Sequence, residues 1–194
     1  MARSIFSFAR LARDRRGMAA VEFALIAPTL IVLFMGVLEM TFRFRANEEA
    51  TRYVHQAADL ISREGEQTNA DLLEIYNASV FMMKPLDTVA NLDMDIASIG
   101  YDADTGIPFT RWRRVIGAQT PLNPLDAAGL GAKGESIIHV GVRFRYTSPI
   151  SSMFGGPNLS IVRDAWARPR TQRLITINGA ASDSGGAPVT LSAS

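Results

Sequence analysis

The stretch Arg15-Arg16-Gly17-Met18-Ala19-Ala20-Val21-Glu22-Phe23 decides the organisation of this chain, together with the apolar run that follows it to Leu38. A basic segment precedes a glycine, and the single carboxylate of Glu22 lies near the start of the apolar run. No residue from Phe23 to Leu38 is charged, and with its flanks the run reaches the roughly 20 residues that a helix needs to span a bilayer. The sequence therefore predicts a transmembrane helix over residues 18–42.

The basic residues are concentrated before this helix. Residues 1–17 hold five arginines and one aspartate, a net charge of +4, so the rest of the chain carries −3 within an overall charge of +1. The positive-inside rule then predicts a cytoplasmic N-terminus, with the residues after 42 on the far side of the membrane. The negative balance of those residues argues against nucleic-acid binding. The chain has no cysteine, which excludes disulfides and thiolate chemistry.

The apolar run has two alternatives to a retained anchor. A cleaved secretory signal has an apolar core of about 7–15 residues that ends in a small-x-small site, and the segment from Phe34 to Met40 offers no such site. A buried helix of a soluble core is the second alternative. Two interpretations of Glu22 also stay open. A carboxylate within a membrane helix is costly and therefore suggests a function, but a glutamate one turn into the helix can also reach the lipid headgroups.

Gly17 followed by Met18-Ala19-Ala20-Val21-Glu22-Phe23 resembles the processing site of type IV pilin-like proteins. In those proteins a prepilin peptidase cuts after a glycine on the cytoplasmic side, and a glutamate occupies the fifth position of the mature chain. The wider run from Arg16 to Leu25, with Pro28 five residues after Phe23, is similar to the TadE-like family, the minor pseudopilins of the tight-adherence (Flp) pilus system. Phe23 stands where Flp-type sites usually have a tyrosine.

The resemblance implies that the leader 1–17 is cleaved between Gly17 and Met18, and that Glu22 and Phe23 act in assembly. Glu22 would pair with the N-terminal amine of a neighbouring subunit inside an apolar filament core, where an unpaired charge is strongly unfavourable. Pro28 lies within the helix, where it removes a backbone hydrogen bond and predicts a kink.

The resemblance also implies a set of partners and a location. The partners are the prepilin peptidase, other minor pseudopilins, the major Flp pilin and the inner-membrane pilus assembly platform. The protein would be a single-pass inner-membrane protein with a periplasmic head, or part of a pilus used for surface attachment. Two other functions remain open: a pseudopilin of a type II-like secretion system, and an uncleaved single-pass anchor of a periplasmic binding module.

The spacing of apolar residues over 43–84 predicts a helical stalk and a second helix. The apolar residues of the stalk recur at spacings of three and four, typical of an amphipathic helix: Ala50, Tyr53, Val54, Ala57, Ala58 and Ile61. Gly65 is expected to end this helix. Thr68-Asn69-Ala70-Asp71 is a capping box that opens the second helix, and Pro85 ends it at about Met83.

Residues 85–177 predict a β-rich head with about four antiparallel strands, over Leu92–Tyr101, Phe109–Ile116, Ile137–Tyr146 and Leu159–Arg170. The whole is an α+β fold of the pilin-like lollipop kind. Trp112 and Trp166 are expected to pack inward, whereas Arg111 and Arg113 are expected to be solvated. Residues 178–194 are polar and rich in small residues, which predicts a flexible tail.

No motif of the head predicts catalysis or a cofactor. Asp102-Ala103-Asp104-Thr105-Gly106 resembles part of a calcium loop, but Arg113 replaces the glutamate of the twelfth position, so a hairpin turn is the better interpretation. Gly129-x-Gly131-x-x-Gly134 lacks the preceding strand and following helix of a dinucleotide site. His55 and His139 are isolated in the sequence. We therefore expect no enzyme activity, no cofactor and no metal.

Overall fold

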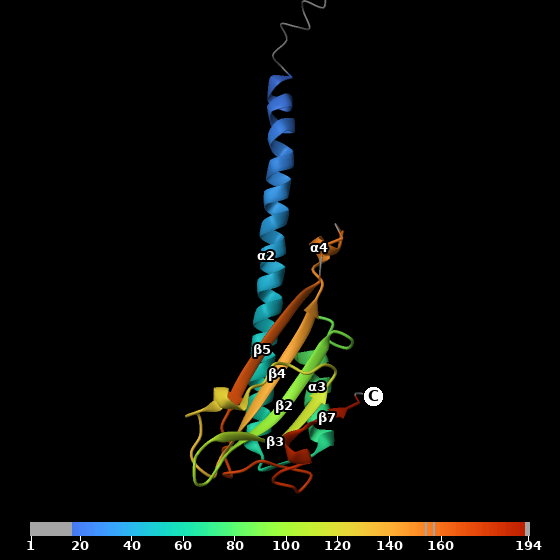
Figure 1. Cartoon of the computed structure of the whole chain (residues 1–194). Coiled ribbons are helices and arrows are strands. Elements are labelled where there is room, and N and C mark those ends of the chain that lie inside the picture. Colours follow the sequence, from blue (N-terminus) through green and yellow to red (C-terminus); the bar gives the residue numbers. More distant parts are fainter. Residues whose placement is uncertain (1–16, 154, 157, 193–194) are drawn as a thin grey trace, which may run out of the picture. The chain divides into compact units, whose positions relative to one another are not determined.

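The computed structural model describes residues 17–153, 155–156 and 158–192 (Figure 1). The main elements are α2 (Met18–Arg63), α3 (Asn69–Met82), β2 (Leu92–Tyr101), β3 (Pro108–Ile116), β4 (Ser136–Tyr146), α4 (Pro149–Met153), β5 (Leu159–Ala167) and β7 (Pro188–Leu191). Shorter elements are β1 (Glu66–Gln67), η1 (Pro124–Ala127), β6 (Thr176–Ile177) and η2 (Ser184–Gly186). The contacts divide the chain into one unit that ends at Thr41 and a second that begins at Phe42. The basic leader over 1–16 lies outside the described residues.

The first unit is the apolar part of α2. The helix begins at Met18, where the Gly17 carbonyl accepts a hydrogen bond of 3.1 Å from the Val21 N–H, and it continues through Pro28 without a break. Its most apolar 18-residue window has a mean hydropathy of 2.3 and is not buried against other parts of the chain. By length and composition this helix can cross a membrane, which confirms the predicted long apolar helix.

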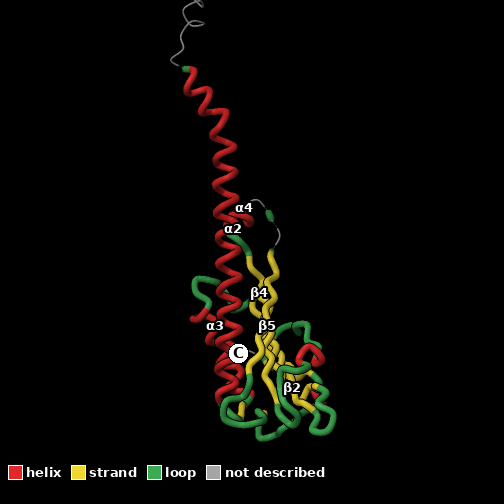
Figure 2. Tube along the Cα trace, turned by 90° about the vertical axis from the view of Figure 1, so that its left-hand side faces the viewer, coloured by secondary structure: helices red, strands yellow, loops and turns green. Residues whose placement is uncertain are grey.

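The second unit is a five-stranded sheet with helices on one face. The strand order is β5-β4-β2-β3-β7, and the remainder of α2 lies with α3 on one side of the strands (Figures 1 and 2). The first four strands pair antiparallel, as predicted, whereas β7 pairs parallel with β3. The fold is therefore α+β, as expected, with a mixed sheet of five strands.

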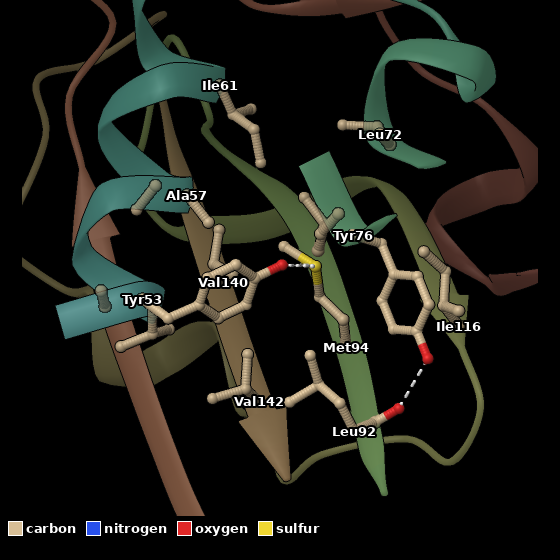
Figure 3. Packing of buried hydrophobic residues seen from close by; sticks show 14 of the residues in the cluster. Tyr53, Ala57, Ile61, Leu72, Tyr76, Leu92, Met94, Ile116, Val140 and Val142 are labelled. Atoms are coloured by element: carbon tan, nitrogen blue, oxygen red, sulfur yellow. Dashed lines mark hydrogen bonds between the residues drawn. The ribbon is translucent and has the colours of Figure 1, made fainter. Parts of the chain in front are cut away.

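The core lies between the helices and the sheet. The apolar stripe predicted for the stalk is buried here against β2 and β4 (Figure 3). Two tyrosines make hydrogen bonds across the core: Tyr53 Oη of α2 donates to the Ile75 carbonyl of α3 over 3.0 Å, which joins the two helices. Tyr76 Oη of α3 donates to the Leu92 carbonyl of β2 over 2.9 Å, which joins the helices to the sheet. Burial raises the pKa of the Tyr53 hydroxyl, so this donor keeps its proton at any physiological pH.

The capping box predicted at the start of α3 is present. Thr68 Oγ1 accepts from the Asp71 N–H over 3.2 Å, and Asp71 Oδ2 accepts from the Thr68 N–H over 2.8 Å. Two of the donors that a helix start leaves unpaired are thereby satisfied. The helix ends at Met82, before Pro85, as expected.

The predicted half-buried β2 is instead buried on both faces, from Leu92 to Tyr101. The loop that contains η1 lies over the face away from the helices, where Tyr101 Oη donates to the Ala127 carbonyl over 2.7 Å. A second, smaller apolar cluster forms there from Ala97, Ile99, Tyr101, Ala127 and Ile137. The alternation of apolar and polar residues in β2 could not predict that a loop covers its second face, because the sequence of that loop has no apolar periodicity.

The predictions for the tryptophans and arginines were partly wrong. Trp112 is buried and its Nε1 donates to the Ile175 carbonyl over 2.9 Å, as expected for a packed residue. Trp166 is only half-buried and packs with the second cluster, not with the main core. Arg113 is not solvated, because it is ion-paired with Asp95 beneath the covering loop.

The predicted flexible tail over 178–194 also differs from the structure. Residues 188–191 form β7, which places Val189 beside Arg114 and Leu191 beside Ile116 of β3. The polar stretch before β7 is held to β3, since the Asp183 N–H donates to the Arg111 carbonyl over 3.0 Å. Composition predicted disorder because it does not register such pairing between distant segments.

Candidate processing and assembly segment

Gly17 precedes the first residue of α2, and the fold supplies no reason for a glycine there. Its φ angle is not in the left-handed region, and a Cβ added to it would meet nothing within 4 Å. By contrast, a Cβ on Gly141 of β4 would collide with the side chain of Thr120. A glycine that neither backbone strain nor packing requires is free to serve recognition by another protein.

Met18, Glu22 and Phe23 are all exposed on the first turns of α2. Within the described part of the chain, the Glu22 carboxylate has no hydrogen bond and no ion-pair partner. It is surrounded along the helix by apolar residues, so in a membrane or an apolar filament the charge would be unsatisfied. The structure thus places Gly17, Met18, Glu22 and Phe23 together on one accessible helix start.

Pro28 lies about three helical turns after Gly17, within α2. It has no N–H to donate to the Ala24 carbonyl, so one hydrogen bond of the helix is missing at this level. The predicted kink at Pro28 stays a prediction.

A buried polar cluster of the head is centred on Asp95 of β2. Asp95 Oδ1 accepts from Arg113 Nε over 2.9 Å, and Oδ2 accepts from Arg113 Nη2 over 2.6 Å and from the Thr120 N–H over 2.9 Å. Arg113 Nη2 also donates to the Thr120 carbonyl over 3.0 Å. The bidentate bond to Asp95 raises the pKa of Arg113. The cluster fixes the covering loop to the sheet, and sequence reasoning missed it because its three residues come from separate segments.

His139 lies on the same face of the sheet, beside this cluster. Its ring packs on Trp166, directly opposite on β5, with 4.4 Å between the ring centroids. Burial lowers the pKa of His139, and Asp164, with an oxygen 3.9 Å from Nε2, opposes that shift only in part. His139 is therefore a neutral packed residue in the folded protein at neutral pH, and it points away from the main core, as predicted.

A second arginine holds the segment before β7. Arg114 is buried, its Nε donates to Asn69 Oδ1 over 2.9 Å, and its Nη2 is ion-paired with Asp183. This arginine lowers the pKa of the Asp183 carboxyl, so the pair persists to acidic pH. Its role is to join α3, β3 and the segment before β7.

The segment from Asp102 to Gly106, which resembles part of a calcium loop, has a structural role. Asp102 Oδ1 accepts from the Asp104 and Thr105 backbone N–H groups over 3.1 and 2.7 Å, and these bonds lower the pKa of its carboxyl. The segment is the turn of the β2–β3 hairpin, as predicted. Across the described residues, no group of three or more histidines and carboxylates is arranged to hold a metal ion.

These features suggest a class of protein: a single-pass membrane protein, in which one N-terminal helix long and apolar enough to cross a membrane is followed along the chain by an α+β head. Residues 17–59 match the model of the TadE-like protein family, which confirms the resemblance in the segment that carries Gly17 and Glu22. This family implies a role in the tight-adherence pilus system. No curated protein and no solved structure matches the chain significantly.

Proposed function

We propose that this protein is a minor pseudopilin of the tight-adherence (Flp) pilus, cut by a prepilin peptidase between Gly17 and Met18. The observation that carries the proposal is the family match over 17–59, whose first residue is the glycine that the fold does not need. Cleavage there makes Met18 the first residue and Glu22 the fifth. The role is structural and not catalytic: the chain joins, primes or caps the pilus with which the cell attaches to surfaces.

The unpartnered carboxylate of Glu22 supports a role in assembly. In a filament core it would be stabilised by the N-terminal amine that cleavage creates on a neighbouring subunit. A subunit in the wrong register would leave the carboxylate buried without a partner, which is strongly unfavourable. Its partners are therefore other minor pseudopilins and the major pilin, assembled on the inner-membrane platform. The N-terminus lies in the cytoplasm and the head in the periplasm.

Co-expression with a prepilin peptidase, followed by N-terminal sequencing, tests the cleavage. The wild-type product should begin at Met18, and Gly17→Val should reduce cleavage at least tenfold. Gly36→Val is the matched control, since a Cβ at Gly36 of the same helix also meets nothing within 4 Å. A wild-type chain that keeps its leader would favour an uncleaved anchor instead.

Glu22→Ala separates assembly from processing. The variant should be cleaved normally but lost from pili isolated from the cell surface, whereas Glu48→Ala, an exposed glutamate farther along α2, should behave as wild type. Normal incorporation of the Glu22→Ala variant would overturn the assembly role of this residue.

A further inference from the structure

One end of the second unit combines exposed apolar and cationic side chains. Four segments meet there: the start of the unit in α2, the loop after α3, the end of β4 and the start of α4. They line a groove of about 380 Å³, whose walls include Phe42, Arg45, Leu86, Arg145 and Pro149. We call this end the span-proximal surface, because Phe42 is the residue at which the chain leaves the apolar unit.

Large apolar side chains in the same segments, next to the residues that line the groove, are open to solvent. Val89, in the loop after α3, is 71% exposed, and Met153, at the end of α4, is 79% exposed. Phe44, one residue before Arg45, is 68% exposed. The short helix α4 contributes no buried residue to the head. It lies at the start of the connection between β4 and β5, and packing among the described residues of the unit does not explain its position.

The charged residues that line the groove are Arg45, Arg145 and Asp87. Arg45 is exposed and, within the described part of the chain, has no ion-pair or hydrogen-bond partner. Arg145 is ion-paired with Asp93, and its Nη2 donates to the Ala90 carbonyl over 3.0 Å. Asp87, the carboxylate among the groove residues, accepts from the Val89 N–H over 3.2 Å. Arg45 thus offers an unneutralised charge beside exposed apolar groups.

We propose that the span-proximal surface rests on the lipid headgroups of the bilayer that α2 spans, with Met153 and Val89 entering the interface and Arg45 at the phosphates. Phe42 follows Leu38 by four residues, about 6 Å along the helix, so the first residue of this surface lies close to the end of the apolar run. Exposed apolar side chains with adjacent arginines are the combination that an anionic interface accommodates. Contact at this surface would fix the tilt of the head. It requires the membrane span but not the cleavage after Gly17.

The chain has no cysteine, so a single introduced cysteine gives a unique label in the full-length protein. Ser152→Cys places a fluorophore on α4, and Ala103→Cys places it in the β2–β3 turn at the other end of β2. Each variant is reconstituted as one chain per nanodisc with spin-labelled lipids that quench at headgroup depth. The label at 152 should be quenched severalfold more than the label at 103, and more strongly with anionic than with zwitterionic lipid. Equal quenching at the two positions would overturn the proposal.

Arg45→Glu tests the electrostatic contribution. Each cationic side chain near an anionic surface is worth roughly fivefold in binding, so the charge reversal should reduce the contact by at least that factor in anionic nanodiscs. Arg52→Glu, two turns farther along α2, is the control and should leave the quenching unchanged. Circular dichroism confirms that both variants stay folded. Unchanged quenching in Arg45→Glu would contradict the contact between this arginine and the lipid phosphates. If the label at residue 152 is protected only when two chains share a nanodisc, the surface binds a second copy of the chain and not lipid, and the proposal is wrong.

Discussion

Asp95 and Arg113 form the most enclosed ion pair among the described residues of the head. The Asp95 side chain is fully buried, and that of Arg113 is 14% exposed. A buried pair adds little net stability compared with apolar residues, but removing one partner leaves the other charge buried and unpaired. The pair therefore constrains the covering loop and makes the head sensitive to a single substitution.

Asp95→Asn should destabilise the head by about 3 kcal/mol, because Arg113 then loses its counter-charge within the cluster. Urea unfolding followed by tryptophan fluorescence measures the change. Arg63→Gln is the control, since its ion pair with Asp59 lies on the surface of α2 and should contribute much less. Equal losses in the two variants would show that the buried pair has no special role.

His139 predicts a pH dependence of stability. The folded protein holds the pKa of His139 below its unfolded value of about 6.5, so the unfolded chain binds more protons as the pH falls below 6.5. The contribution of the neutral ring is present above pH 6.5 and is lost as the pH falls towards the folded-state pKa. The groups that face the ring are Asp164, Asp95, Arg113 and Asp126.

His139→Phe keeps a ring against Trp166 but removes the titration. The loss of Tm between pH 7.5 and pH 5 should become smaller by a few degrees, at about 2–4 °C for each kcal/mol in a chain of this size. His55→Phe, at an exposed position of α2, is the control for replacing a histidine elsewhere in the chain. An identical profile for His139→Phe and wild type would mean that other groups cause the acid sensitivity.

At the scale of elements, the chain shows which patterns predict structure and which do not. The apolar helix, the capping box at Thr68 and four strands were predictable because each has a local periodicity or a local hydrogen-bond partner. β7 was not, because its strand character comes from pairing with β3, far away in sequence. Arg114 and Asp95 were missed for the same reason. At the N-terminus the opposite holds: Gly17 and Glu22 stand out in the sequence, whereas among the described residues no packing contact requires the glycine and no side chain pairs with the Glu22 carboxylate.

β7 is expected to contribute measurably to the stability of the sheet. In the full chain Leu191 is 9% exposed and belongs to the main core. A chain that ends after Ala187 lacks β7, and the core residues that Leu191 covers become exposed to solvent. The loss should be about 1.5–3 kcal/mol, the value for burying one leucine, as measured by urea unfolding. A chain ended after Leu191 is the control and should match the full chain. No difference between the two truncations would show that β7 is marginal.

For the whole molecule, the burial pattern separates the membrane span from the head. The buried residues of α2 begin at Ala46 and end at Ser62, so the part of the helix before Phe42 contributes nothing to the core. One helix therefore has two parts: exposed apolar side chains in its first half and a single buried stripe in its second.

A chain that starts at Phe42 should consequently fold by itself in water. We expect the far-UV circular dichroism of an α+β protein, one cooperative thermal transition, and a Tm within a few degrees of that of the full chain in mild detergent. Loss of the near-UV signal or of cooperativity would contradict this, and would show that the head depends on the membrane-spanning residues for its structure.

The enclosure of β2 has a further consequence, for the tolerance of the chain to mutation. From Leu92 to Tyr101 every position is buried, with the helices on one side and the loop that contains η1 on the other. A strand with one solvent face can vary at every second residue, but β2 has no such positions. Random substitutions should therefore accumulate on β5 and the outer surface of α2 and be removed from β2, so we expect β2 to be the slowest-changing segment of the head.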